Sequence, residues 1–113
     1  MDVYEQRRAD ILILQPTGRL DSNSAQDLQG ELTRRLSDGE TSIVLDLKDL
    51  DYISSAGLRV LLLIGKELQK KNGRLSLCAL NNTVREVFEI SGFISLFPIH
   101  TSVDDAIGAA SSS

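Results

Sequence analysis

Apolar positions form their most regular pattern in the middle of the chain. An almost continuous apolar run at residues 43–47 is typical of a strand buried on both faces. From residue 58 the pattern changes to leucines at three- and four-residue spacing, which predicts an amphipathic helix that ends near residues 71–73. We therefore expect a buried strand and a helix here, joined by a short polar segment.

Shorter apolar runs predict the remaining strands. A weak strand from Val3, a tight reversal at residues 8–10 and a second strand at Ile11–Leu14, ended by Pro16, together predict a hairpin. Residues 17–21 are expected to form a loop that leaves the second strand. The later strands are predicted at residues 74–80 and 93–99.

Capping residues precede the other apolar patterns. Ser24 to Asp27 is close to a capping box and starts a first helix that ends at Asp38-Gly39, while Thr83 to Glu86 is a full capping box. Residues 102–105 cap a final helix. Gly30 should cost the first helix about 1 kcal/mol relative to Ala. The sequence gives no reason for a glycine here, and close packing against it is one explanation. The apolar positions are Ala25, Leu28, Leu32 and Leu36 in the first helix, Val84, Val87, Phe88 and Ile90 in the third, and Val103, Ala106 and Ile107 in the last.

The order of elements, β-β-α-β-α-β-α-β-α, predicts an α/β fold. Strands that alternate with helices imply crossover connections and a mixed, mostly parallel sheet packed against helices. We expect a single domain over residues 1–113, with its core at about 3–108 and a low-complexity end that frays at 109–113. The residues expected to be buried include Leu45, Leu61, Leu62, Leu77, Val87 and Phe88.

Composition narrows the class of function. A formal net charge of -4 argues against nucleic acid as a partner, because such binding needs a basic face. No apolar run approaches the roughly 20 residues of a membrane helix, and the N-terminus lacks the pattern of a signal region. The single cysteine, Cys78, fits a reducing compartment. The expected protein is cytoplasmic, free of membrane contacts and monomeric when free.

Residues that support catalysis are few. One histidine, His100, and one cysteine cannot supply a metal cluster of the usual spacing. No Gly-x-Ser-x-Gly elbow surrounds residues 54–55, and no Walker A loop is present. Asp46, Asp49 and Asp51 lack a loop that would converge them and are expected to form a solvated acidic rim. The sequence favours a binding module without metal or cofactor over an enzyme.

The polar segment between the central strand and its helix, residues 52–57, carries two adjacent hydroxyls. Serine is favoured at a helix N-cap because its oxygen accepts from amide N–H groups that otherwise lack a partner, so capping alone could explain one of them. Gly57 leaves the first helical turn without a side chain. We expect this to let another backbone or an anion approach the helix N-terminus.

This segment resembles the phosphorylation loop of the STAS family, the anti-sigma-factor antagonists of bacteria. In that family a strand ending in a hydrophobic residue and Asp is followed by Asp-Ser-Ser/Thr-Gly-Leu and then a helix. Ser54 matches the family's Asp and Ala56 its second hydroxyl residue, and these two positions depart from the pattern. Ser55 matches the phosphoacceptor serine. Gly57 and Leu58 match the Gly-Leu.

A second element of the resemblance lies earlier in the chain. Gly18, Leu20 and Asp21 match the family's Gly-x-Leu-Asp, in which the Asp lies near the phosphorylated serine at the partner-facing end. A turn or a helix-capping carboxylate is the alternative role for Asp21. The order of elements also resembles the STAS fold, from about residue 3 to residue 108.

The resemblance implies an anti-sigma factor antagonist. Unphosphorylated, it would bind an anti-sigma factor with serine-kinase activity and free a sigma factor or other target; the kinase would modify Ser55, and a cognate phosphatase would reset the switch. The departures at Ser54 and Ala56 keep an alternative open: a STAS-like module that senses a small molecule or scaffolds a complex and is never phosphorylated. The residues expected to contact the partner are Asp21, Ser54, Ser55, Ala56, Gly57, Leu58 and Arg59.

Overall fold

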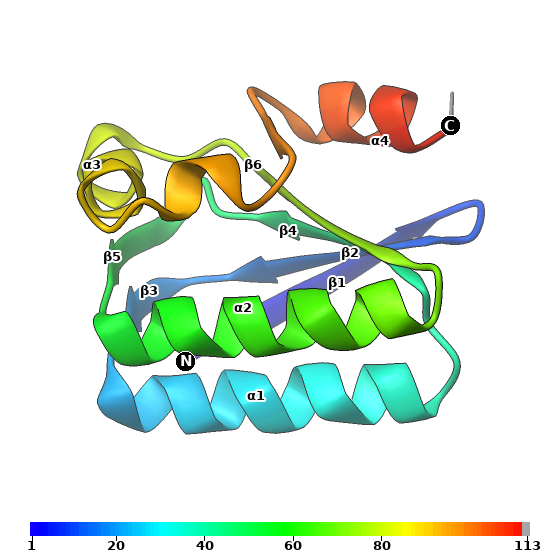
Figure 1. Cartoon of the computed structure of the whole chain (residues 1–113), viewed down its shortest axis with the longest axis horizontal. Coiled ribbons are helices and arrows are strands. Elements are labelled where there is room, and N and C mark those ends of the chain that lie inside the picture. The colour runs from blue at the N-terminus through cyan, green and yellow to red at the C-terminus, as the bar shows by residue number, and fades with distance from the viewer. Residues whose placement is uncertain (112–113) are drawn as a thin grey trace.

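A sheet with helices on both faces forms the body of the protein, and the computed structural model describes residues 1–111 (Figure 1). The strands are β1 (Val3–Arg8), β2 (Ile11–Pro16), β3 (Gly18–Leu20), β4 (Ser42–Asp46), β5 (Leu50–Ile53), β6 (Arg74–Cys78) and β7 (Ile99–His100). The helices are α1 (Ser22–Ser37), α2 (Ser55–Lys70), α3 (Asn82–Ile90) and α4 (Val103–Ser111), with a 3-10 turn, η1, at Phe93–Ser95. Helices α1 and α2 lie side by side on one face of the sheet, and α4 lies on the other.

The main sheet contains five strands in the order β1-β2-β4-β6-β7. β1 and β2 form the predicted antiparallel hairpin, with Ala9 at a φ of 54° in its turn. The β2–β4, β4–β6 and β6–β7 pairs are parallel, because each pair is joined by a crossover that contains a helix. The prediction of an α/β fold with a mixed, mostly parallel sheet is confirmed.

Alternating side chains of the central strands divide the core into two layers. Leu12 of β2 and Leu45 of β4 belong to the layer under α1 and α2. Ile13 of β2, Val44 of β4 and Cys78 of β6 belong to the layer under α4. Both faces of β4 are therefore covered, as its apolar run predicted.

Two short strands form a separate parallel pair, β3–β5. The prediction of a loop at residues 17–21 is wrong, because β3 occupies residues 18–20. With so few residues, neither strand can show a clear alternation of apolar and polar positions. Each strand ends on one fully buried side chain, Leu20 in β3 and Ile53 in β5. These two side chains anchor the pair to the core.

Two helices begin earlier than their predicted capping boxes. Asp21 caps α1 by accepting a hydrogen bond from the N–H of Ser24 at 3.0 Å, so the capping box predicted to start at Ser24 is wrong. Asn81 caps α3, its side-chain oxygen accepting from the N–H of Val84 at 2.8 Å, in place of the predicted Thr83. In both cases an Asx residue upstream of the predicted cap satisfies the free amides first.

The strand predicted at residues 93–99 is much shorter than expected. Gly92, at a φ of 78°, follows α3 as predicted, but η1 comes next and only two residues join the sheet as β7. The ring of Phe97 packs edge-on against Phe88 of α3, with centroids 6.3 Å apart. The segment that follows α3 thus packs against that helix.

The C-terminal helix is longer than predicted. α4 continues to Ser111, so residues 109–111 of the end expected to fray at 109–113 are helical, and residues 112–113 lie outside the described part. Among the described residues no helix is both long and apolar enough to cross a membrane.

The expected core is largely confirmed, with errors at the edges of two helices. Leu45, Leu61, Leu77 and Phe88 are fully buried, whereas Leu62 and Val87 are only partly buried. Ile90, predicted to lie on the buried face of α3, is 81% exposed because it occupies the last turn of a short helix.

The buried face of α2 accounts for the error at Leu62. It is centred on Val60, Leu61, Ile64 and Leu68. Leu62 lies beside this face, at the edge that borders Leu96 and Phe97.

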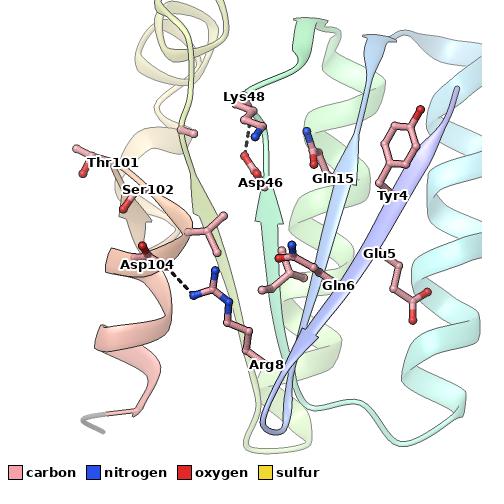
Figure 2. A pocket seen from close by; sticks show the side chains of 13 residues that line it. Tyr4, Glu5, Gln6, Arg8, Gln15, Asp46, Lys48, Thr101, Ser102 and Asp104 are labelled. Carbon is pink, nitrogen blue, oxygen red and sulfur yellow. Dashed lines mark hydrogen bonds and ion pairs between the residues drawn. The ribbon is translucent and has the colours of Figure 1, made fainter.

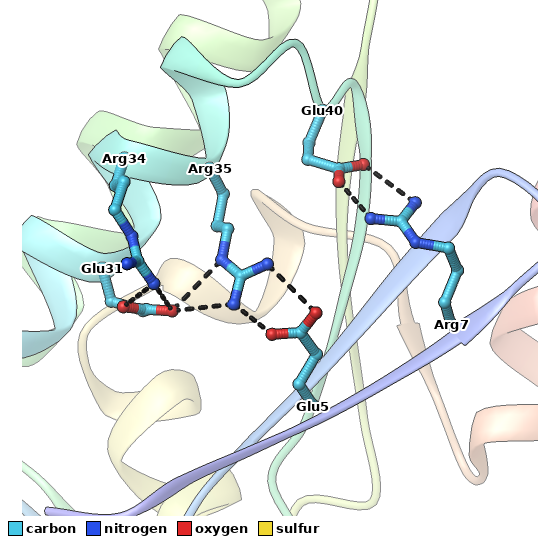
Figure 3. A network of polar contacts seen from close by, with 6 residues as sticks. All are labelled: Glu5, Arg7, Glu31, Arg34, Arg35 and Glu40. Carbon is cyan, nitrogen blue, oxygen red and sulfur yellow. Dashed lines mark hydrogen bonds and ion pairs between the residues drawn. The ribbon is translucent and has the colours of Figure 1, made fainter.

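A network of charged side chains attaches β1 to the first helix and to the segment that follows it (Figure 3). Arg35 of α1 binds Glu5 of β1 and also Glu31, and Arg7 of β1 binds Glu40. The hydrogen-bonded Arg35 guanidinium holds the pKa of the Glu5 carboxyl below its ordinary value. Because this pKa is lowered in the folded protein, the contribution of Glu5 to stability is present at neutral pH and is lost as the pH falls and the carboxylate is protonated.

Candidate partner-binding site

Two strand-to-helix junctions meet at one end of the molecule. β3 and β5 are paired so that Leu20 lies beside Ile53, and the backbone N–H of Ser54 donates to the carbonyl oxygen of Leu20 at 2.8 Å. A single residue then separates each strand from its helix, Asp21 before α1 and Ser54 before α2. The N-termini of α1 and α2 therefore lie side by side, at the left of Figure 1.

Ser54 caps α2. Its backbone is extended, with a φ of -91°, and its hydroxyl oxygen accepts a hydrogen bond from the N–H of Gly57 at 3.2 Å. Serine thus performs at this position the capping that a carboxylate could also perform. Of the two adjacent serines, Ser54 is therefore the one that caps the helix.

Ser55 is the first residue of α2 and is exposed. Within residues 1–111 its hydroxyl forms no hydrogen bond. The first backbone amides of a helix have no intrahelical partner, and the helix dipole favours negative charge beside them. An accessible hydroxyl at this point is available for modification, and the local field favours the charge that a phosphate would bring.

Gly57 and Leu58, two of the residues expected to contact the partner, are buried. Leu58 is 4% exposed and belongs to the main core, so its side chain is not available to a partner. A Cβ atom on Gly57 would lie 2.8 Å from Leu20 and 2.9 Å from Ile53. Gly57 therefore allows α2 to pack closely on the β3–β5 pair. The space left by its missing side chain is filled by Leu20 and Ile53, and not by the other backbone or anion that was expected to approach.

Gly30 and Gly57 should respond in opposite ways to replacement with alanine. Apart from its chain neighbours and the nearby backbone of its own helix, no atom of the described residues lies within 4 Å of a Cβ built on Gly30, so the suggested close packing is not found there. Gly30→Ala should stabilise the protein by about 0.5–1 kcal/mol through helix propensity. Gly57→Ala should destabilise it by about 1–3 kcal/mol through overpacking. Urea denaturation of both variants measures the two changes, and a loss of stability in Gly30→Ala would contradict the open environment.

Asp21 caps α1, which is the alternative role considered for it beside contact with a partner. Its junction lies next to that of Ser54. Its carboxylate accepts from backbone and side chain of Ser24, and these hydrogen bonds, with a smaller contribution from nearby Arg19, hold its pKa below the ordinary value. Asp21 therefore keeps its negative charge at neutral pH. The chain thus presents one carboxylate and the Ser55 hydroxyl on neighbouring helix starts.

The remaining members of the predicted site differ in exposure. Arg59, one turn after Ser55, is exposed and forms no ion pair within the described residues. Ala56 is partly buried against the core. One nearby contact was not predicted: the Arg19 guanidinium lies 4.5 Å from the ring centroid of Tyr52. Recognition of β3 and β5 as paired strands would have revealed it, because Arg19 and Tyr52 are register partners.

A family model described as the STAS domain matches residues 2–106 of this chain. The chain belongs to the STAS domain family. This STAS domain is 52% identical over 92 residues to BtrV of Bordetella bronchiseptica, a candidate anti-sigma factor antagonist, with 81% of this chain and 79% of that protein covered. The name given to that relative agrees with the expectation of a regulatory binding protein rather than an enzyme.

Solved structures show the same fold. A candidate anti-sigma factor antagonist from Thermotoga maritima has a TM-score of 0.90 at 23% identity, covering 95% of this chain and 92% of that one. The anti-sigma factor antagonist SpoIIAA, in its unphosphorylated form, has a TM-score of 0.85 at 21% identity, covering 99% and 98%. SpoIIAA in its phosphorylated form has a TM-score of 0.75 at 21% identity, covering 96% and 99%.

Proposed function

We propose that this STAS domain is an anti-sigma factor antagonist whose binding is switched by phosphorylation of Ser55. The observation that carries the proposal is that the two adjacent serines at the start of α2 have different environments. Ser54 caps the helix, and Ser55 is exposed with a hydroxyl that no described residue binds. The name of BtrV and the existence of a phosphorylated form of SpoIIAA support it.

The unphosphorylated domain would bind an anti-sigma factor that is also a serine kinase, and so release a sigma factor or another target. The contact surface would be centred on the start of α2, with Asp21 beside it. Ser54, Ser55, Ala56 and Arg59 would contribute side chains, while Gly57 and Leu58 would contribute through the backbone and the shape of the helix start. A cognate phosphatase would reverse the modification.

Phosphorylation would act at the contact surface rather than on the fold. A phosphoserine adds about -1.5 to -2 charges at pH 7. The free amides and dipole of α2 can accommodate that charge, at a gain of roughly 0.3–1 kcal/mol. A partner surface shaped for a hydroxyl would instead have to cover a dianion that lies close to the Asp21 carboxylate. Covering a charge without a matching cation costs several kcal/mol.

Mass spectrometry of the protein isolated from its native host tests the proposal. We expect a phosphorylated peptide that spans the start of α2, with fragment ions that place the phosphate on Ser55. The Ser55→Ala variant, expressed in the same host, should lack it. Phosphate on Ser54 alone would refute the assignment. An unmodified peptide in every growth condition would favour a constitutive STAS module that senses a small molecule or scaffolds a complex.

A further inference from the structure

A polar cleft opens on the face of the main sheet opposite α1 and α2 (Figure 2). It has a volume of about 480 Å³, within the range of roughly 300–1,000 Å³ that is usual for small-molecule sites. Its walls come from β1, β2, the end of β4 and the segment that leads into α4. The lining side chains that matter below are Tyr4, Gln6, Arg8, Gln15, Asp46 and Lys48.

Strand register brings three polar side chains into one row across this face. Tyr4 of β1 pairs with Gln15 of β2. Gln15 follows Leu14, which pairs with Leu45 of β4, so the next residue of β4, Asp46, lies beside Gln15. Side chains in one row of a sheet point to the same face. The row therefore forms one end of the cleft.

Asp46 is the unusual member of this row, since it is only 5% exposed. The prediction that Asp46 belongs to a solvated acidic rim is wrong, because its side chain is buried on the face of the sheet that α4 packs against. Its Oδ1 accepts a hydrogen bond from the backbone N–H of Lys48 at 3.2 Å. Within residues 1–111, Oδ2 accepts none and no cationic side chain forms an ion pair with it.

The free oxygen of Asp46 must open into the cleft. No buried side-chain oxygen or nitrogen of the described residues lacks a hydrogen-bond partner, so Oδ2 is reached by solvent, and the cleft is the space that Asp46 lines. A carboxylate can accept about four hydrogen bonds, and a largely buried charge is stabilised when a cation or donor meets it. The cleft thus offers a carboxylate oxygen with unused capacity.

Two other side chains of the cleft, Arg8 and Gln15, already have partners. Arg8 reaches from β1 to Asp104 of α4, with 2.6 Å between their nitrogen and oxygen atoms, as Figure 2 shows. Gln15 donates through Nε2 to Asp49 at 2.6 Å. Within the described part of the chain, the Tyr4 hydroxyl, the Gln6 amide and the Lys48 ammonium form no side-chain hydrogen bond or ion pair.

We propose that this cleft binds a small molecule through a protonated amine, which donates a hydrogen bond to Oδ2 of Asp46. An ammonium group carries three donors and a positive charge. The side-chain oxygen of Gln15, which lies beside Asp46 in the row and whose Nε2 donates to Asp49, is an acceptor for a second donor. A divalent cation would need several oxygen ligands, and within residues 1–111 no group of three acidic, histidine or cysteine side chains could hold a metal ion.

Two kinds of amine share this chemistry. An amino acid would also place its carboxylate near Lys48 at the rim, whereas a diamine would leave Lys48 without a partner. The site does not depend on the proposed switch at Ser55, because none of its residues belongs to the junctions that carry Ser54 and Asp21. Ser55→Asp should therefore bind the amine as the unmodified protein does.

Titration of the 113-residue chain, followed by amide NMR shifts, tests the site with L-alanine and putrescine as probes. We expect saturable shifts at residues around the cleft, with a Kd of about 1 mM or tighter for at least one probe. Tetramethylammonium, a cation without N–H donors, should not bind. Stronger binding of L-alanine would identify an amino acid site, and stronger binding of putrescine a diamine site.

Asp46→Asn keeps the oxygen that accepts from Lys48 but removes the charge, and it should weaken binding by about tenfold to a hundredfold. The matched control is Asp27→Asn, which changes an exposed carboxylate on α1 and should bind as the wild type does. Gln6→Trp fills the cleft from an exposed position of an edge strand and should abolish binding even if Asp46→Asn folds poorly.

Three results would overturn the proposal: no saturable shift with either probe in the millimolar range, equal binding by Asp46→Asn when it is folded, or undiminished binding by Gln6→Trp. Binding of tetramethylammonium as tight as that of the amines would also overturn it, because the hydrogen bond to Asp46 would then be dispensable.

Discussion

Replacing Ser55 with aspartate is expected to weaken binding of the anti-sigma factor by about tenfold or more while the fold is kept. The carboxylate is an imperfect mimic of phosphate, but it places a negative charge at the exposed start of α2, beside the junction that carries Asp21. Covering that charge without a matching cation costs several kcal/mol, and each 1.4 kcal/mol corresponds to about a tenfold change in Kd. Isothermal titration calorimetry with the purified anti-sigma factor measures the change.

Two neighbouring variants separate the switch from a general loss of structure. Ser55→Ala should bind at near wild-type strength and resist the kinase, because the hydroxyl has no structural partner in the described residues. Ser54→Ala should lower stability by about 0.5–2 kcal/mol through loss of the cap and still accept phosphate on Ser55. If Ser55→Asp and Ser55→Ala both bound like the wild type, the domain would be a constitutive scaffold.

Truncation of Leu61 is expected to destabilise the protein by about 2–5 kcal/mol, the usual cost of a leucine-sized cavity in a core. Leu61 is 1% exposed and lies in the main core cluster. Leu62→Ala is its matched control. Leu62 is only partly buried, so less apolar surface returns to water and the cost should be nearer 1 kcal/mol.

Urea denaturation of both variants, with unchanged m-values, would give the two free energies of unfolding. Equal losses would mean that the face of α2 turned towards the core is centred closer to Leu62 than the structure places it.

These two leucines illustrate how far the sequence could define the helices. The three- and four-residue spacing predicted a helix with a buried face, and α2 has one. Residues at the edge of that face could not be assigned, because their burial depends on what packs beside the helix. Leu62 borders Leu96 and Phe97, from a segment predicted as a strand that instead turns against α3. The spacing within α2 alone therefore could not assign Leu62.

The candidate site was predicted in part, for a comparable reason. Capping preference and the family pattern together placed Ser54 and Ser55 at the start of α2, where the structure has them. The pattern could not show that Leu20 and Ile53 occupy the space beside Gly57, because β3 and β5 are too short to be recognised and their pairing is a tertiary contact. The burial of Leu58 depends on the same packing.

Chemical labelling of Cys78 can measure how often the last helix, α4, detaches from the sheet. It is the only cysteine of the chain, it is fully buried in the layer under α4, and burial raises its pKa to about 12. Alkylating reagents attack the thiolate, so the native protein should resist them and each labelling event should record an opening that exposes the sulfur. If α4 detaches while the other helices stay packed, labelling will outpace the global unfolding rate extrapolated from denaturant. If the two rates coincide, α4 and the sheet open as one cooperative unit.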